Sequence, residues 1–212
     1  MCGKFTAQAT WRQVVDFSAP LAAGIRESVV YRPMMMVPVI VHDREAGRRR
    51  VVPMRWGFPH RGNPNRPDPI HARAETIDEK PTFKAAFENG QRGIVAVQTF
   101  NSGKDLPSGK VEQWVVDPAD NQAHGIAFVW RRFEIEGQPA PLLACAMVTV
   151  PPNGLIRSIT DRMPAVLEAP DWPVWLGETA ASPAEAKAVL KVPAGTDWRM
   201  APEKQPSQPS FL

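Results

Sequence analysis

Short apolar runs separated by turn-forming residues recur along the chain and predict a fold dominated by β-strands. Runs of this kind, rich in β-branched and aromatic residues, are typical of strands in a partly buried sheet. They predict strands at residues 28–31, 37–42, 50–56, 93–98, 112–116, 125–130 and 142–150. Residues 43–47, Asp-Arg-Glu-Ala-Gly, separate the second and third of these strands and predict a hairpin turn.

Three short segments carry the signals of helices. Residues 10–17 and 78–89 have apolar side chains at helical spacing, and Phe83 and Phe87 in the second segment are one turn apart. Residues 182–185, Ser-Pro-Ala-Glu, predict the start of a third helix. The serine is a good N-cap, proline suits the first helical position, and the glutamate completes a capping box.

The composition is that of an ordinary globular domain, with 43% hydrophobic and 22% charged residues, which excludes a disordered chain or a coiled coil. Proline is the exception. Its 23 occurrences in 212 residues are about twice the usual share, so long helices are not expected. We predict one α+β domain over residues 1–200 with a mainly antiparallel, barrel-like sheet and a few short helices. A Pro-rich, loosely ordered tail is expected over residues 201–212.

The net charge of +3 permits an anionic partner without requiring one. The longest apolar run, residues 139–150, is well short of the ~20 residues that a membrane helix needs. Lys4, Gln8 and Arg12 interrupt any apolar stretch at the start, so no signal peptide is expected. These features favour a cytoplasmic protein without membrane contact, and we expect a monomer.

The two cysteines occupy different chemical settings. Cys145 lies in an apolar run and is expected to be an inert core thiol. Cys2 follows the initiator Met1, whose removal leaves a free amino-terminal cysteine. Its amine and thiol are both partly nucleophilic near neutral pH, and together they condense with an aldehyde to form a thiazolidine ring. A second interpretation is that the same terminus attacks an amide as an amino-terminal nucleophile. A third is that Cys2 has no function.

Two further clusters allow both a binding and a structural interpretation. Arg55 and Trp56 stand at a predicted strand end, where Trp56 either stacks on a base while Arg55 meets phosphate, or packs in the core. The arginine run at 48–50 is interpreted as a solvated hairpin flank rather than a DNA contact.

Residues 71–76 alternate between small and polar side chains. In a strand, His71, Arg73 and Glu75 would share one face, as in an ion-paired site or a solvated edge. We expect neither a metal nor another cofactor, because the sequence has no Gly-rich phosphate loop and its histidines lack ligand spacing. They are His42, His60, His71 and His124.

Four blocks, taken in order, resemble the SOS-response-associated peptidase (SRAP) family, the abasic-site processing proteins. Met-Cys-Gly-Lys-Phe at 1–5 is similar to the family's Met-Cys-Gly-Arg-Phe start, and Arg-Trp-Gly-Phe at 55–58 to its Arg-Trp-Gly-Leu element. Ala-Arg-Ala-Glu-Thr at 72–76 and Asp-Arg-Met-Pro at 161–164 resemble two further family blocks. Order and spacing agree over roughly residues 1–176.

The resemblance implies a β-rich domain that binds single-stranded DNA containing abasic sites during the DNA damage response. It implies that Cys2, once Met1 has been removed autoproteolytically, condenses with the abasic aldehyde to give a thiazolidine crosslink. Arg73 and Arg162 match DNA-backbone contacts, and Trp56 lies in the DNA-facing element. Lys4 is a further predicted DNA contact; it replaces an arginine of the family, which keeps the charge but loses the bidentate fork. Such a cytoplasmic protein would associate with the nucleoid when bound to DNA.

Three supporting positions depart from the family pattern. His71 stands where the family has Asn, Ser102 where it has a catalytic Glu, and Thr160 where it has His. A missing general acid or base typically costs ~10²–10⁴ in rate. One hypothesis is that His71 supplies the lost hydrogen bonding and proton transfer. The alternative is a diverged paralogue that binds DNA or another ligand without crosslinking. An amino-terminal-nucleophile amidohydrolase is the third hypothesis.

Overall fold

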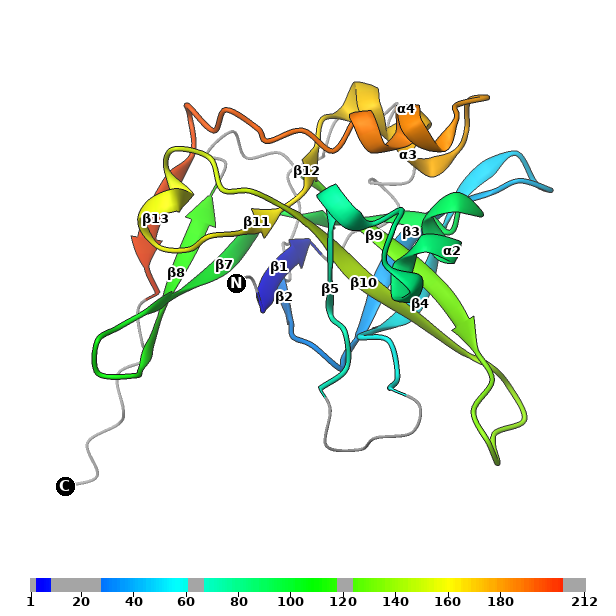
Figure 1. The fold of residues 1–212 in the computed structure, drawn as a ribbon, viewed down its shortest axis with the longest axis horizontal. Coiled ribbons are helices and arrows are strands. Elements are labelled where there is room, and N and C mark those ends of the chain that lie inside the picture. Colours follow the sequence, from blue (N-terminus) through cyan, green and yellow to red (C-terminus); the bar gives the residue numbers. More distant parts are fainter. Residues whose placement is uncertain (1–2, 9–27, 61–66, 118–123, 204–212) are drawn as a thin grey trace.

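Strand β10 (Leu142–Val150) organises the fold because it is paired along both edges. It pairs antiparallel with β9 (His124–Phe133) and parallel with β4 (Arg48–Trp56). Strand β4 pairs with β3 (Met36–Asp43), β3 with β6 (Arg92–Val97), and β6 with β9. These five strands therefore close into a barrel. The computed structural model describes residues 3–8, 28–60, 67–117 and 124–203 (Figure 1).

Short strands extend the barrel sheet at its rim. Strand β5 (His71–Arg73) continues the parallel pairing with β10 where β4 ends, so Met147 lies opposite His71. Strand β11 (Met163–Pro164) pairs with β10, and β12 (Val166–Leu167) pairs with β9.

A second sheet stands beside the barrel, in the strand order β13-β8-β7-β1-β2. Strand β1 (Lys4–Gln8) lies between β2 (Ser28–Tyr31) and β7 (Thr99–Asp105). Strand β8 (Val111–Asp117) and β13 (Arg199–Pro202) complete the sheet. Only Gln98 separates β6 from β7, so one segment of chain runs from the barrel into the second sheet (Figure 1).

The helices are short and lie outside the barrel (Figure 1). Helix α2 (Pro81–Glu88) buries Phe83 and Phe87, and α3 (Trp172–Leu176) is fixed to β6 by a Trp175 indole N–H that donates to the Gly93 carbonyl. Helix α4 (Pro183–Ala188) begins with a capping box. Three 3₁₀ turns are η1 (Ala74–Thr76), η2 (Ile156–Ser158) and η3 (Ala169–Asp171).

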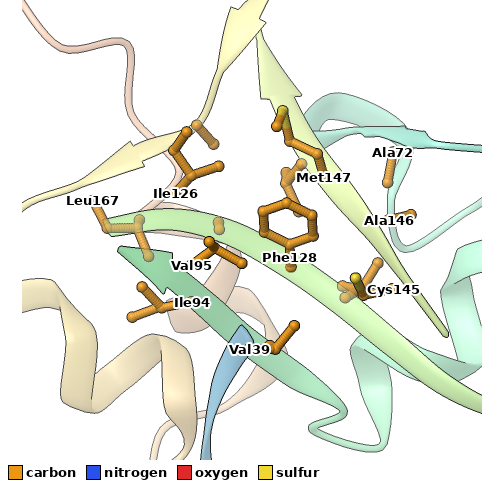
Figure 2. Packing of buried hydrophobic residues seen from close by; sticks show 14 of the residues in the cluster. Val39, Ala72, Ile94, Val95, Ile126, Phe128, Cys145, Ala146, Met147 and Leu167 are labelled. Atoms are coloured by element: carbon orange, nitrogen blue, oxygen red, sulfur yellow. The ribbon is translucent and has the colours of Figure 1, made fainter. Parts of the chain in front are cut away.

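Aliphatic and aromatic side chains from the barrel strands form the core (Figure 2). Phe128 of β9 lies among Val95, Met147 and Cys145, and all four are fully buried. Burying a side chain of this size contributes about 1.5–3 kcal/mol. Burial also raises the pKa of the Cys145 thiol, which keeps it protonated at neutral pH and confirms that it is an inert core residue.

The predicted fold class is confirmed, and the seven predicted strands occur within three residues of their expected ends. The hairpin is also confirmed: the Asp43 carboxylate accepts from the backbone N–H groups of Glu45 and Ala46, and residues 48–50 form its returning strand. Arg49 in that run bonds Glu178, so this residue has a structural role. The helix predicted at 10–17 lies outside the described residues.

Two predictions about where ordered segments begin or end were wrong. Residues 201 and 202 belong to β13, where Ala201 pairs with Val115, and the Glu203 N–H then donates to the Gln113 carbonyl. Residues 201 and 202 are therefore ordered rather than loose, because they pair with the edge of β8. Strand β5 also stops at Arg73, so Glu75 sits in η1 rather than on a strand face with His71.

Within the described residues, no helix is both long and apolar enough to cross a membrane.

Candidate functional site

The amino-terminal end of β1 is held firmly because Phe5 anchors it in the core. Phe5 is fully buried, and its ring lies 5.2 Å from that of Trp56 and 5.5 Å from that of Tyr31. Strands β2 and β7 pair with β1 on either side. Cys2 itself lies outside the described residues. Gly3, to which Cys2 is bonded, is the first residue that the structure describes.

A pocket of about 300 Å³ opens at this end of β1. Gly3, Lys4 and Arg32 line it together with Gln113 and Glu203 from the other side. The Lys4 ammonium forms an ion pair with the Glu203 carboxylate, and both side chains are largely buried. Lys4 therefore enters the pocket as half of an ion pair rather than as a solvent-exposed cation. Its partner Glu203 follows β13, and nothing in the sequence pattern pointed to this pairing.

His71 is brought toward β1 by an aromatic chain. Its ring meets the Trp56 ring edge-on at 6.3 Å, and Trp56 in turn contacts Phe5. The Trp56 indole N–H donates to the carbonyl of Ile70, the residue before His71, at 3.0 Å. His71 is half-buried. The Trp56 ring therefore connects His71 to Phe5, which lies three residues after Cys2.

Trp56 does not face solvent. Its side chain is 0% exposed and packs against Phe5 and Phe128, so neither face of the indole is open to a base. The prediction of a DNA-facing Trp56 was wrong, and the core interpretation of this residue is the correct one. The physical reason is its position: Trp56 points into the space between the barrel and the second sheet, where an aromatic ring fills volume.

Two buried polar groups lie next to β1 on strand β7. Asn101 is the cross-strand partner of Lys4, and Ser102 follows it. The Asn101 amide nitrogen and the Ser102 hydroxyl have no hydrogen-bond partner among the described residues, although both residues are buried. Because unsatisfied buried polar atoms are rare in proteins, they are typical of sites that take up water or a ligand group. Asn101 was not among the predicted site residues, and an asparagine inside a strand is the signal that was missed.

Arg162 and Glu75 form a charged cluster on the other side of β5. Arg162 donates to both Glu75 carboxylate oxygens, at 2.6 and 2.8 Å, and to the Thr149 carbonyl at 2.6 Å. The hydrogen bonds from Arg162 hold the pKa of Glu75 below its usual range, and burial opposes this shift. Arg162 is only 9% exposed, and its Nε is a buried donor that no group in the described part of the chain accepts from.

Arg73 belongs to the same cluster but remains exposed. It lies opposite Thr149 in the β5–β10 pairing, and its charge acts on Glu75. Two arginines and one carboxylate leave one net positive charge, carried at the surface by Arg73. Thr160 lies in the turn after η2, where its N–H donates to the Ile156 carbonyl at 3.1 Å. Arg73 and Arg162 thus both lie beside Thr149 of β10, whereas Lys4 belongs to the second sheet.

Among the described residues, no three His, Cys, Asp or Glu side chains come close enough together to hold a metal ion.

The family model for SOS response associated peptidase (SRAP) matches residues 1–205. The chain therefore belongs to the SRAP family, as its sequence blocks indicated. Two relatives from Bacillus subtilis (strain 168) are named abasic site processing proteins. YoaM is 26% identical over 197 residues, covering 90% of this chain and 85% of the relative. YoqW is 27% identical over 200 residues, covering 90% and 87%.

Solved structures show the same fold. A crystal structure of a protein from Bordetella bronchiseptica superposes with a TM-score of 0.75 at 22% identity, covering 96% of this chain and 100% of that one. A protein from Bacteroides thetaiotaomicron gives a TM-score of 0.75 at 18% identity, covering 96% and 92%. At these identities the likeness shows the fold alone.

Proposed function

We propose that this protein acts on abasic sites in single-stranded DNA and captures them covalently through Cys2. The observation that carries this proposal is the anchoring of β1. Phe5 is locked between Trp56 and Tyr31, so the chain directly after Cys2 is fixed beside a pocket. A nucleophile bonded to an anchored segment needs less ordering to react, which favours a bond-forming role for Cys2. The names of the Bacillus relatives, abasic site processing proteins, support the same substrate.

The atoms and electrons of the proposed reaction balance without a cofactor. Hydrolysis of the Met1–Cys2 amide first consumes one water and releases methionine. The free α-amine then adds to the ring-opened aldehyde and loses water to form an imine. The Cys2 thiol adds to the imine carbon, and its proton passes to the nitrogen, which closes the thiazolidine ring. Capture of the aldehyde releases one water, which balances the water consumed in removing Met1, and no step is an oxidation or a reduction.

His71 is the candidate for moving protons in these steps. It is half-buried, it contacts Trp56, and an imidazole both accepts and donates protons near neutral pH. Ser102, at the family's Glu position, has a fully buried hydroxyl, which lacks the charge and the second oxygen of a carboxylate and therefore does not replace one. We assign the positioning of the DNA backbone to the exposed Arg73 and to Arg162 beside it, whose terminal nitrogens already bond Glu75 and Thr149.

The buried Ser102 also favours a second function: a diverged family member that binds DNA without crosslinking it. The two functions are separated by incubating the purified protein with an oligonucleotide that carries one abasic site, followed by a denaturing gel. Cys2→Ala protein and an undamaged strand are the matched controls. The crosslinking function predicts a shifted band that requires both Cys2 and the abasic site. Absence of the band, in protein shown by mass to lack Met1, leaves the binding function.

A further inference from the structure

A second cavity of about 300 Å³ lies beyond the end of β4, between β9 and the first turn of α2. Its floor is aromatic and rigid. Phe58 and Phe133 are buried, their rings lie 5.2 Å apart, and Phe58 also contacts Phe83 of α2 at 5.6 Å. Pro59 and Pro69 form part of the wall. The cavity is therefore preformed, because its floor belongs to the hydrophobic core rather than to a surface loop.

The polar residues that line this cavity are basic or neutral. Arg131, Arg132 and His60 contribute to it, and no carboxylate is among its described lining residues. The nearby Asp68 is already used on both oxygens: Oδ1 accepts the His60 N–H at 2.8 Å and Oδ2 accepts from Arg55 at 2.7 Å. Arg132 pairs with Glu134, but both side chains are well exposed, and such pairs are weak.

Arg131 is held in a position suited to anion binding. Its guanidinium lies 5.2 Å from the centre of the Phe133 ring, and no ion pair with a described carboxylate neutralises it. Stacking occupies the flat face of a guanidinium and leaves the N–H groups at its edge available to a planar or tetrahedral oxyanion. Thr82, in the first turn of α2, adds a hydroxyl to the same cavity.

The cavity is separate from the candidate site at His71. His71 lies opposite Met147, and Met147 lies opposite Phe128, so these side chains share one face of the sheet. Arg131 is three residues beyond Phe128 on β9. Because successive side chains in a strand alternate between faces, Arg131 points to the opposite face, which α2 covers.

We propose that this cavity binds the phosphate of a nucleotide, with the sugar or base resting on the proline and aromatic wall. The positive lining without a competing carboxylate selects an anion, and the volume is that of a small ligand rather than of a bare ion. A free nucleotide and a nucleotide within a DNA strand both carry a phosphate next to a sugar and a base. This proposal does not depend on Cys2 chemistry, so failure of crosslinking leaves it standing.

The test is an NMR titration of isotope-labelled full-length protein with three probes that contain no aldehyde: dAMP, inorganic phosphate and an undamaged ten-nucleotide strand. The proposal predicts that dAMP shifts the backbone resonances of Thr82 and Arg131. It also predicts that Arg131→Gln weakens dAMP binding by about 10-fold or more, as for loss of a charged hydrogen bond. Arg131→Lys should retain part of the affinity, because it keeps the charge without the fork.

Arg50→Gln is the matched control, since it removes the same charge from an exposed residue of β4 and should change binding less than 2-fold. If the strand competes with dAMP, a strand phosphate is the physiological occupant. If it does not, a free nucleotide is the occupant. The proposal is overturned if no probe shifts Thr82 or Arg131 in the parent protein, or if Arg131→Gln and Arg50→Gln bind dAMP equally. The parent titration remains decisive even if Arg131→Gln folds poorly.

Discussion

The barrel and the five-stranded sheet beside it differ in how fully their polar groups are satisfied. Among the described residues, the four buried side-chain polar atoms without a partner belong to Asn101, Ser102, Asn153 and Arg162. All four lie outside the five strands that close the barrel. The barrel strands instead contribute a continuous apolar core around Phe128. The barrel strands therefore hold none of these unsatisfied polar atoms, which lie in the second sheet and in the loops.

The largest expected effect comes from the barrel core. Phe128→Ala should lower the free energy of unfolding by about 3–5 kcal/mol, because it leaves a cavity among fully buried neighbours. Urea denaturation followed by circular dichroism measures this change. Val111→Ala, an exposed position of the second sheet, is the control and should cost less than about 0.5 kcal/mol. Equal costs at the two positions would contradict the packing role given to Phe128.

The next effect concerns catalysis rather than stability. His71→Ala should slow crosslinking to an abasic oligonucleotide by about 10²-fold, because it removes the proposed proton-transfer group. Affinity for undamaged single-stranded DNA should change only a few-fold. His42→Ala is the matched control, since its imidazole bonds the Gly177 carbonyl far along the chain from the site. A His71→Ala protein that crosslinks at the parent rate would contradict the role given to His71.

Breaking the charged cluster should have a smaller, pH-dependent effect. Glu75→Gln should lower the free energy of unfolding at pH 7 by about 1–3 kcal/mol, because the buried Arg162 loses its anionic partner. The lowered pKa of Glu75 means that its contribution is present above the unfolded value of about 4.3 and is lost as the pH falls further.

Stability curves at several pH values measure both effects. The parent should lose stability on acidification more steeply than Glu75→Gln does. Glu88→Gln, which removes an exposed charge paired with Lys84, serves as the control and should change stability by less than about 0.5 kcal/mol. Parallel pH profiles for the parent and Glu75→Gln would show that the cluster does not couple protonation to folding.

The smallest effect separates two serines. Ser102→Ala removes a buried hydroxyl without a partner and should raise the free energy of unfolding by about 1 kcal/mol. Ser182→Ala removes the N-cap of α4 and should lower it by about 1 kcal/mol. Thermal melts of the two variants suffice. A destabilised Ser102→Ala protein would mean that the hydroxyl is satisfied in solution.

Local sequence signals accounted for the elements that depend on local chemistry. Apolar runs located β2 and β10, and the Ser182 capping box located α4. Strand β7 was missed because Thr-Phe-Asn-Ser-Gly-Lys-Asp is rich in residues that favour turns. It is a strand because β1 and β8 pair with it on both sides, which is a tertiary effect.

The candidate site was predicted less completely, because its geometry depends on residues far apart in sequence. Arg162 was predicted to contact DNA, yet its bond to Glu75 spans 87 residues and no local pattern encodes it. Lys4 and Glu203 are 199 residues apart, and their pairing follows from β13 closing the second sheet. Trp56 was assigned to the surface by its motif, whereas the meeting of two sheets buries it.

The most direct test of the central claim is the mass of the intact product formed with an abasic oligonucleotide, followed by peptide mapping. The account predicts one adduct equal to the chain without Met1 plus the DNA, minus one water, with the modification on Cys2. An adduct mapped to a lysine, or a protein that retains Met1 and still crosslinks, would contradict the aminothiol mechanism.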